Sequence, residues 1–313
     1  MQQLEDSFVL LNMVAELRKA KTLAEEFTSQ SKTDQNDYIH HLLTRMHFMP
    51  DGKNTPYVCI LDTGVTSGHP LLAQSISMKD CFTINPAWSS ADSANHGTGI
   101  AGIILYGENL ADKLEDSNQY ETVCRLESSK IVNVRRCEEK EKPEIYAAHT
   151  KQAVSKAEIA NPERLRLFQM AVTTDDSRDK GRPSSWSAAM DTIAFGRDNE
   201  TQTNPRLCVV SGGNFDPSST NKSDYPAINK NESIHDPAQA WNVITVGACT
   251  GLDRLTGNDA KGDNRPVAKK GELSPYSTTS NMWNIDWPYK PDIVMEGGNT
   301  AANELPGQVQ ADS

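Results

Sequence analysis

The sequence has no run of about 20 apolar residues, the length that a helix needs to cross a bilayer. Residues 1–6 show neither the basic region nor the apolar core of a signal peptide. Basic residues are also few: 31 lysines and arginines stand against 42 aspartates and glutamates, a formal net charge of −11. Such a charge disfavours nucleic acid and anionic membranes as partners. We therefore predict a cytoplasmic protein that binds neither nucleic acid nor membrane.

Motifs for redox or metal chemistry are also missing. The six cysteines are scattered, and no two of them form a C-x-x-C pair. Cys59 and Cys208 stand in apolar runs, where a reduced thiol packs as a small hydrophobic side chain. The adjacent His40 and His41 would point about 100° apart on a helix and cannot easily share an ion. We expect no cofactor and no metal centre, although calcium bound through surface carbonyls is compatible with the sequence.

The chain is predicted to have two parts. Residues 4–48 carry apolar residues at roughly helical spacing, interrupted by Thr-Ser-Gln-Ser at 28–31. Pro-Asp-Gly-Lys-Asn at 50–54 then has the composition of a linker. We predict a helical N-terminal segment of two helices over residues 1–50, followed by a larger domain over residues 51–313.

The larger domain alternates short apolar runs with helical patterns. Strands are predicted at residues 57–61, 130–134, 166–172, 207–210 and 243–246. Helices are predicted at residues 99–106, 146–160 and 184–195. Runs that are apolar on both faces are typical of a parallel sheet covered on both sides. The fold class is therefore α/β, an open doubly wound and mostly parallel sheet with helices on both faces. The polar segments 108–121 and 138–142 are interpreted as surface insertions.

Asp62 opens the first chemically informative motif, Asp62-Thr63-Gly64, directly after a predicted strand. The carboxyl ends of parallel strands form the edge where open α/β sheets place their sites. A carboxylate there can accept the Nδ1 proton of a histidine and so fix its tautomer. Asp-Thr-Gly is also the signature of aspartic proteases, which need a second carboxylate. Neither Asp-Thr-Gly nor Asp-Ser-Gly occurs again in the chain.

His96 and Asn214 each belong to a glycine-rich block. Three glycines follow His96, at the start of the predicted helix and just before it, and a glycine within a helix costs about 1 kcal/mol relative to alanine. A helix tolerates that cost where its backbone must approach another element closely. Asn214 ends Ser211-Gly212-Gly213-Asn214, which follows the predicted strand 207–210. Taken alone that block is a common turn, but its place after a buried strand and downstream of His96 favours a functional site.

Together these blocks resemble those of the subtilisin-like serine proteases (subtilases, peptidase S8), over roughly residues 57–298. The resemblance implies that Asp62 is the acid that orients the base, His96 the base, and Asn214 the donor to the oxyanion. It also implies peptide or protein substrates, held between two walls of an S1 pocket. Those walls would be formed by Thr173 and Thr174 on one side and by Ser211, Gly212 and Gly213 on the other. The chain departs from the family pattern at Gly99, where another histidine is frequent.

The family's nucleophile is a serine in a Gly-Thr-Ser-x-Ala block, and no such block occurs in the chain. Lys290-Pro291-Asp292-Ile293 resembles the block that shortly precedes that serine, whereas Ser277 and Ser280 lie before it and Ser313 is the last residue. We expect the sequence to be the front part of a longer serine endopeptidase, inactive without its nucleophile. The alternative is a catalytically inactive pseudoprotease that binds peptides or a protein partner.

Overall fold

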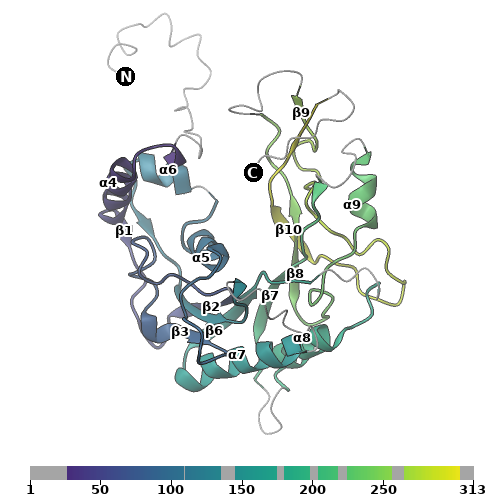
Figure 1. Cartoon of the computed structure of the whole chain (residues 1–313), viewed down its shortest axis with the longest axis horizontal. Coiled ribbons are helices and arrows are strands. Elements are labelled where there is room, and N and C mark those ends of the chain that lie inside the picture. The colour runs from purple at the N-terminus through teal and green to yellow at the C-terminus, as the bar shows by residue number, and fades with distance from the viewer. Residues whose placement is uncertain are drawn as a thin grey trace, which may run out of the picture.

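A computed structural model describes residues 27–108, 110–134, 145–174, 180–197, 204–217, 224–255 and 264–303. Its centre is a sheet of seven strands in the order β10-β8-β7-β6-β2-β5-β3, with every neighbouring pair parallel (Figure 1). The strands are β2 (Pro56–Asp62), β3 (Cys81–Thr83), β5 (Arg125–Lys130), β6 (Leu165–Met170), β7 (Leu207–Ser211), β8 (Ile244–Cys249) and β10 (Ile293–Glu296). The predicted doubly wound, parallel α/β fold is confirmed.

Helices lie on both faces of this sheet (Figure 1). On one face α7 (Tyr146–Ala160) and α8 (Ser185–Phe195) contact each other and the strands. On the other face α5 (His96–Tyr106) packs over β2. Ser184 caps α8 through a capping box, and Gly196 ends it in the left-handed conformation. The three helices predicted in this domain are all present, with α5 starting three residues earlier than expected.

Two hydrophobic clusters fill the space between sheet and helices. Cys59 of β2 and Cys208 of β7 are fully buried in the cluster beneath α7 and α8, as expected for small core thiols. Val58 and Ile60 of β2 point the other way, into the cluster beneath α5. The alternation within β2 follows from the period of two along a strand. It explains why the run 57–61 is apolar throughout.

The N-terminal segment contributes to the second cluster. Helix α4 (Lys32–Leu43) occupies the place of the second predicted helix, while the first lies outside the described residues. Leu42 of α4 is fully buried in the same cluster as Ile60. The short strand β1 (Met46–His47) pairs in parallel with β4 (Tyr120–Glu121). The domain boundary near residue 50 stays a prediction, although α4 and β1 pack against the larger domain.

The segment 108–121, predicted to be a surface insertion, is anchored to the domain by one buried side chain. Helix α6 (Leu110–Glu115) and β4 form there, and Leu114 is buried in the cluster beneath α5. Arg45 holds this segment in place, because its guanidinium donates hydrogen bonds to the Asp116 carboxylate (2.9 Å) and to the Lys113 carbonyl (2.7 Å). Charged residues that appear solvated in the sequence are therefore held by a distant arginine. The other predicted insertion, 138–142, lies outside the described residues.

The strand predicted at 130–134 was also misplaced, because the structure has β5 at Arg125–Lys130. Glu127, Ser128 and Ser129 are fully buried although they are polar. Because these residues are polar, a search for apolar runs does not find this interior strand. Glu127 is accommodated there because Arg164 and Arg166, at the start of β6 on the other side of β2, neutralise it.

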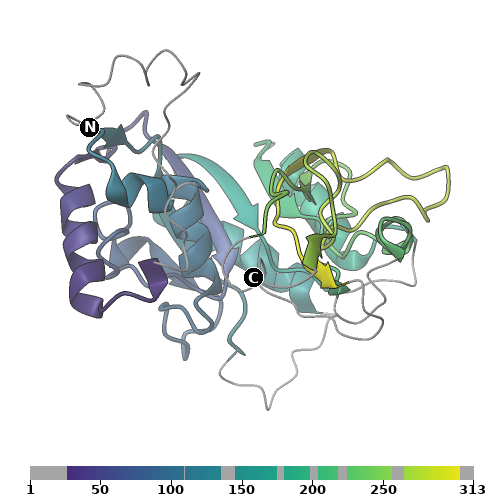
Figure 2. The ribbon, with the colours of Figure 1, turned by 90° about the horizontal axis from the view of Figure 1, so that it is seen from above.

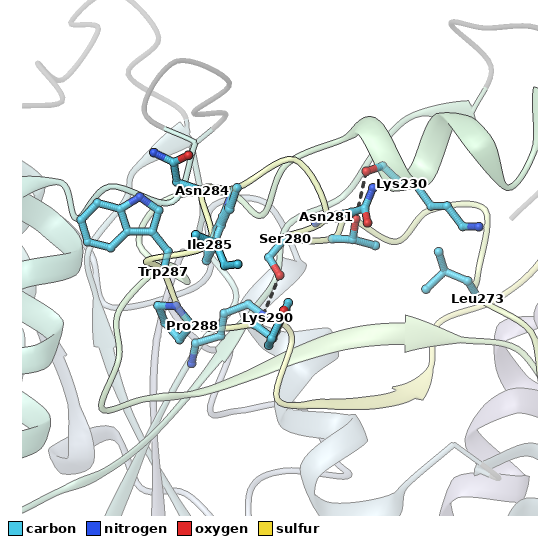
Figure 3. Close-up of a pocket in the computed structure, with 12 residues that line it drawn as sticks. Lys230, Leu273, Ser280, Asn281, Asn284, Ile285, Trp287, Pro288 and Lys290 are labelled. Atoms are coloured by element: carbon cyan, nitrogen blue, oxygen red, sulfur yellow. Dashed lines mark hydrogen bonds between the residues drawn. The ribbon is translucent and has the colours of Figure 1, made fainter.

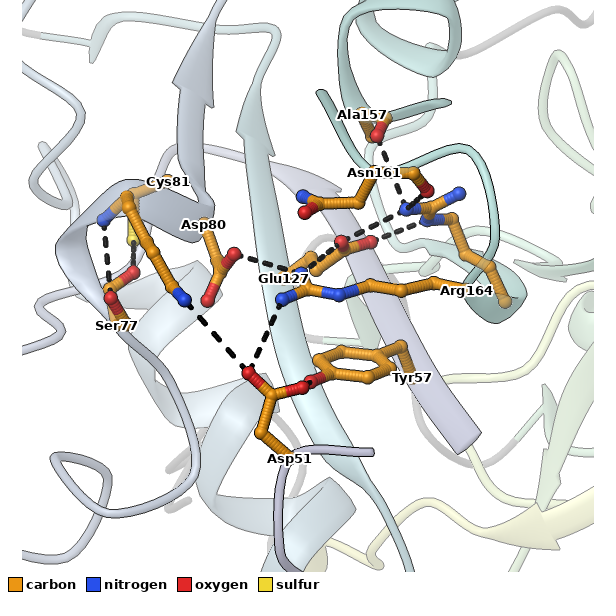
Figure 4. A network of polar contacts seen from close by, with 11 residues as sticks. Asp51, Tyr57, Ser77, Asp80, Cys81, Glu127, Ala157, Asn161 and Arg164 are labelled. Atoms are coloured by element: carbon orange, nitrogen blue, oxygen red, sulfur yellow. Dashed lines mark hydrogen bonds and ion pairs between the residues drawn. The ribbon is translucent and has the colours of Figure 1, made fainter. Parts of the chain in front are cut away.

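That polar network lies at the amino ends of β2, β5 and β6 (Figure 4). The Glu127 carboxylate accepts a hydrogen bond from Arg164 (2.6 Å). It accepts two more from Arg166, one from Nε and one from Nη2 (2.9 Å for the second). Arg164 also donates to Asp80 (2.8 Å) in the short helix η1 (Met78–Asp80) and lies over the Tyr57 ring. Burial and the hydrogen bond to Asp51 raise the pKa of Tyr57 to about 12.

The C-terminal part of the described chain lies at the end of the sheet opposite α4, as the yellow and purple segments of Figure 2 show. It contains β10 at the edge of the sheet and a small antiparallel pair, β9 (Asn264–Pro266) with β11 (Ala301–Asn303). The short helix α9 (Ala227–Asn231) precedes β8 in the sequence. Across the described ranges, the helices are all too short or too polar to traverse a bilayer.

Candidate active site

The structure brings Asp62 and His96 into direct contact. Asp62 is the last residue of β2 and its side chain is fully buried. His96 is the first residue of α5, and its Nδ1 lies 2.8 Å from Asp62 Oδ1 and 3.0 Å from Oδ2. An imidazole held in this way carries its proton on Nδ1 and presents Nε2 as a base.

Glycine makes this approach possible. A β-carbon added at Gly97 would lie 2.2 Å from the Gly64 carbonyl oxygen and 3.3 Å from the β-carbon of Asp62. Asn95, which precedes α5, has the left-handed backbone conformation (φ 64°). The first turn of the helix therefore lies directly against the end of β2, and a larger residue at position 97 would push it away.

Asp92 is a residue of this site that the sequence analysis missed. Its carboxylate accepts hydrogen bonds from the Thr98 amide (2.7 Å), the Thr98 hydroxyl (2.6 Å) and the Ala94 amide (2.9 Å). It also accepts from the Thr63 hydroxyl (2.8 Å), next to Asp62. Burial acts to raise the pKa of Asp92, but these hydrogen bonds hold it below the ordinary value. Asp92 thus ties the loop before α5 to the end of β2.

The environment of His96 favours its charged form. The hydrogen bond to Asp62 raises the pKa of His96 above its ordinary value, and partial burial opposes that shift. The ring is still 52% exposed, so one edge faces solvent while Nδ1 is held. Among the described residues its hydrogen bonds go to Asp62 alone. The pair is therefore arranged to accept a proton from a group that approaches Nε2.

The Asp62 contact can be tested by titration. We expect Asp62→Asn to lower the pKa of His96, because the variant removes the carboxylate that favours the imidazolium. In the wild type the raised folded-state pKa means that the contact stabilises the fold fully below pH about 6.5 and loses this effect as pH rises through the folded pKa. Histidine ring NMR across a pH series measures the shift. His69, whose pKa is lowered by burial, should titrate alike in both proteins; an unshifted His96 would contradict the expectation.

The predicted oxyanion donor lies at the same edge of the sheet but does not contact the pair. Asn214 follows β7 by three residues, is exposed, and pairs through its backbone with Ser277. One strand, β6, separates β7 from β2, which corresponds to about 10 Å between the two strand axes. Among the described residues its side chain makes no hydrogen bond with Asp62 or His96.

The two predicted substrate walls follow β6 and β7 and are joined by residues 234–236. Thr174 exchanges two backbone hydrogen bonds with Asp236 (2.8 and 3.0 Å). The His235 amide donates to the Gly212 carbonyl (2.9 Å), and Gly212 packs over Ile234. His235, which the sequence analysis did not identify, therefore lies between the walls.

Two serines near the C-terminus are buried and bonded to the main chain. The Ser277 hydroxyl accepts from the Ala248 amide (3.1 Å), and the Ser280 hydroxyl accepts from the Lys290 amide (2.8 Å). Figure 3 shows Ser280 beside Lys290 in a hollow of about 600 Å³ that is lined by residues such as Trp287. Neither serine hydrogen-bonds His96. In the part of the chain that the structure describes, no group of three or more His, Cys, Asp or Glu could hold a metal ion.

Most of the chain is similar to a known protein family. The sequence model of the subtilase family matches residues 53–313. An uncharacterized protein of Sinorhizobium fredii, y4bN, is 32% identical over 129 residues, which cover 38% of this chain and 28% of that protein.

Two solved structures are similar at lower identity. The epidermin leader peptide processing serine protease of Staphylococcus aureus is 16% identical with a TM-score of 0.43, over 90% of this chain and 60% of that one. The S41 psychrophilic protease is 16% identical with a TM-score of 0.41, over 65% and 56%. The chain thus spans less than two thirds of each of these proteins.

Proposed function

Because this chain belongs to the subtilase family, we propose that it carries the acid and the base of a serine endopeptidase that hydrolyses peptide or protein substrates. The observation that carries the proposal is the contact of His96 Nδ1 with both oxygens of the buried Asp62 carboxylate, at the carboxyl edge of the sheet. A serine supplied by a further part of the polypeptide completes the triad.

The proposed mechanism uses each group in turn. The serine hydroxyl attacks the scissile carbonyl while His96 Nε2 takes its proton, and the resulting imidazolium is stabilised by Asp62. The carbonyl oxygen becomes an oxyanion and accepts a hydrogen bond from the Asn214 amide, an interaction worth about 3–4 kcal/mol of barrier. His96 then returns the proton to the leaving amine, and the acyl-enzyme is hydrolysed by water.

Exposed apolar side chains on one side of the sheet support the proposal that another segment completes the site. In-register neighbours of a sheet point to the same side, and Val58 of β2 pairs with Leu167 of β6, which pairs with Leu207 of β7. Val58 is buried beneath α5, whereas Leu207 is 50% exposed. On the side of the sheet that carries α5, Val58 of β2 is therefore covered, whereas Leu207 of β7 is exposed to solvent.

Strand β10 extends this open surface. Ile293 and Met295 pair with Val246 and Ala248 of β8 and are 49% and 61% exposed. On the opposite side of β7, Cys208 and Val210 are fully buried. Exposed apolar side chains that gather on one side of a sheet are typical of an interface. We infer that the segment with the nucleophile packs here, on the same side of the sheet as His96.

Fluorophosphonate labelling of the full-length protein tests the proposal. We expect one labelled serine, mapped by mass spectrometry of the digested protein to sequence beyond residue 313, and loss of labelling in His96→Ala. A control variant, His47→Ala, changes an exposed histidine of β1 and should label normally. A folded protein that binds peptides but takes no label would instead support the pseudoprotease alternative.

A further inference from the structure

Asp92 is bound to residues that adjoin both members of the Asp62–His96 pair. Its carboxylate accepts hydrogen bonds from the Thr63 hydroxyl (2.8 Å), the Ala94 amide (2.9 Å) and the amide and hydroxyl of Thr98 (2.7 and 2.6 Å). The first of these donors follows Asp62, and the other two residues lie two positions before and two positions after His96. One buried carboxylate therefore holds the chain on both sides of the contact.

The Thr63 hydroxyl lies between two carboxylates and has one proton to donate. Its oxygen is 2.8 Å from Asp92 Oδ1 and 3.1 Å from Asp62 Oδ1, and the shorter contact assigns the proton to Asp92. The same oxygen accepts a hydrogen bond from the amide of Gly97 (3.3 Å), the residue after His96. Asp92 thus orients a hydroxyl that joins the end of β2 to the first turn of α5.

We propose that Asp92 is a positioning residue, which fixes His96 against Asp62 through the Thr63 hydroxyl and the first turn of α5. Its part in catalysis rests on the proposed function, in which His96 is the base. Reacting groups must meet at about 3–3.5 Å, and a displacement of about 1 Å can cost about 10²-fold in rate. The contacts of Asp92 lie within two residues of the pair, so their loss shifts the imidazole directly.

The charge of Asp92 also acts on the imidazole. The hydrogen bond with Asp62 is the largest cause of the raised pKa of His96, burial opposes it, and the charges of Asp62 and Asp92 add to it. Hydrogen bonds hold the pKa of Asp92 itself below the ordinary value, so this carboxylate is charged at neutral pH. From β5, the Lys130 ammonium donates to the Ala91 carbonyl (2.9 Å), next to Asp92.

The first test is Asp92→Asn in the full-length protein. The asparagine side chain lacks the charge and can donate to the Thr63 oxygen, so the hydroxyl proton turns toward Asp62. We expect kcat for a peptide substrate to fall about tenfold while KM stays within about twofold, because Asp92 acts on the geometry of the base and not on substrate binding. Asp253→Asn makes the same change on an exposed residue and should leave both constants unchanged.

A titration reports on the environment of His96 without any activity. The pKa of His96, followed by ring NMR, should be lower in Asp92→Asn than in the wild type. Histidine acts as a base only when it is neutral, so the acid limb of kcat/KM against pH should move to lower pH in the variant. A loss of stability alone would leave this limb in place.

The second test keeps both carboxylates and removes the hydroxyl between them. Thr63→Val preserves the shape of the side chain and should lower kcat about tenfold, whereas Thr63→Ser restores the hydroxyl and should keep kcat within about twofold of the wild type. Thr192→Val is the matched control, since it removes a hydroxyl that donates to the Ala188 carbonyl (2.7 Å) within α8. That variant should keep the wild-type kcat.

The outcomes separate this inference from the proposed function. If Asp92→Asn is folded and keeps the wild-type pKa of His96, Asp92 does not position the base, even if kcat falls. A folded Thr63→Val protein with the wild-type kcat overturns the inference as well. A wild-type protein that takes no fluorophosphonate label and cleaves no peptide overturns the proposed function, whereas a lower pKa of His96 in its Asp92→Asn variant would still support the contact between Asp92 and the pair.

Discussion

Replacing Asp62 by asparagine in the full-length protein is expected to lower the kcat of the proposed peptidase activity about 10⁴-fold with little change in the fold. In the wild type both carboxylate oxygens lie within 3.0 Å of His96 Nδ1, so the ring proton is held there. In the proposed mechanism this leaves Nε2 free to accept the serine proton. An asparagine amide can donate to Nδ1 instead. The ring proton then moves to Nε2, and the histidine can no longer act as a base.

The measurement is steady-state kinetics with one peptide substrate across pH 6 to 9. Asp253→Asn makes the same change on an exposed residue and should leave kcat within about twofold of the wild type. If Asp62→Asn lowers kcat by tenfold or less while the melting temperature is unchanged, Asp62 is not the partner of the base. Loss of activity with a collapse in melting temperature would point to a structural role for the carboxylate, which also accepts from the Thr63 amide (2.7 Å).

The contact of Asp62 with His96 could be predicted because each residue stands in a short motif at a predictable place. Asp62 ends an apolar strand, and the glycines after His96 indicate a helix in close approach to another element. The structure supplies the reason, since Gly97 lies against the Gly64 carbonyl. Local sequence therefore carried most of the information about this pair.

Asp92 and His235 could not be predicted in that way, because their roles depend on residues far away in the sequence. Asp92 accepts from Thr63, 29 residues earlier, and His235 lies beside Thr173, 62 residues earlier. A single aspartate or histidine in a polar loop gives no periodicity and no motif of its own. The signal that could have found Asp92 is its position four residues before His96.

Strand β5 was misplaced for a related reason. Hydrophobic periodicity finds a buried strand only if its side chains are apolar. Glu127 is fully buried by virtue of Arg164 and Arg166, which follow it by more than 30 residues. Paired charges therefore take the place of apolar residues in this interior strand, next to the edge strand β3. The apolar run at 130–134 led to a predicted strand that begins where β5 ends.

The same pairing predicts a large loss of stability. We expect Glu127→Leu to lower the free energy of unfolding by about 3–5 kcal/mol, because it leaves two arginines with buried charge and without their shared acceptor. Their side chains are 11% and 5% exposed, so water replaces the carboxylate poorly. Arg164 keeps its contact with Asp80 (2.8 Å), whereas the acceptors left to Arg166 among the described residues are the carbonyls of Ala157 and Asn161. Urea denaturation followed by circular dichroism measures the change.

Two further variants identify the cause of that loss. Glu163→Leu makes the same replacement on an exposed residue next to Arg164 and should change the unfolding free energy by less than about 0.5 kcal/mol. Adding Arg166→Met to Glu127→Leu removes the charge left most isolated and should restore part of the stability, since an apolar replacement of a buried ion pair is often neutral or favourable. A single variant as stable as the wild type, or a double variant less stable than the single one, would mean that β5 is held by its backbone pairing with β2 and β3 and not by this charge network.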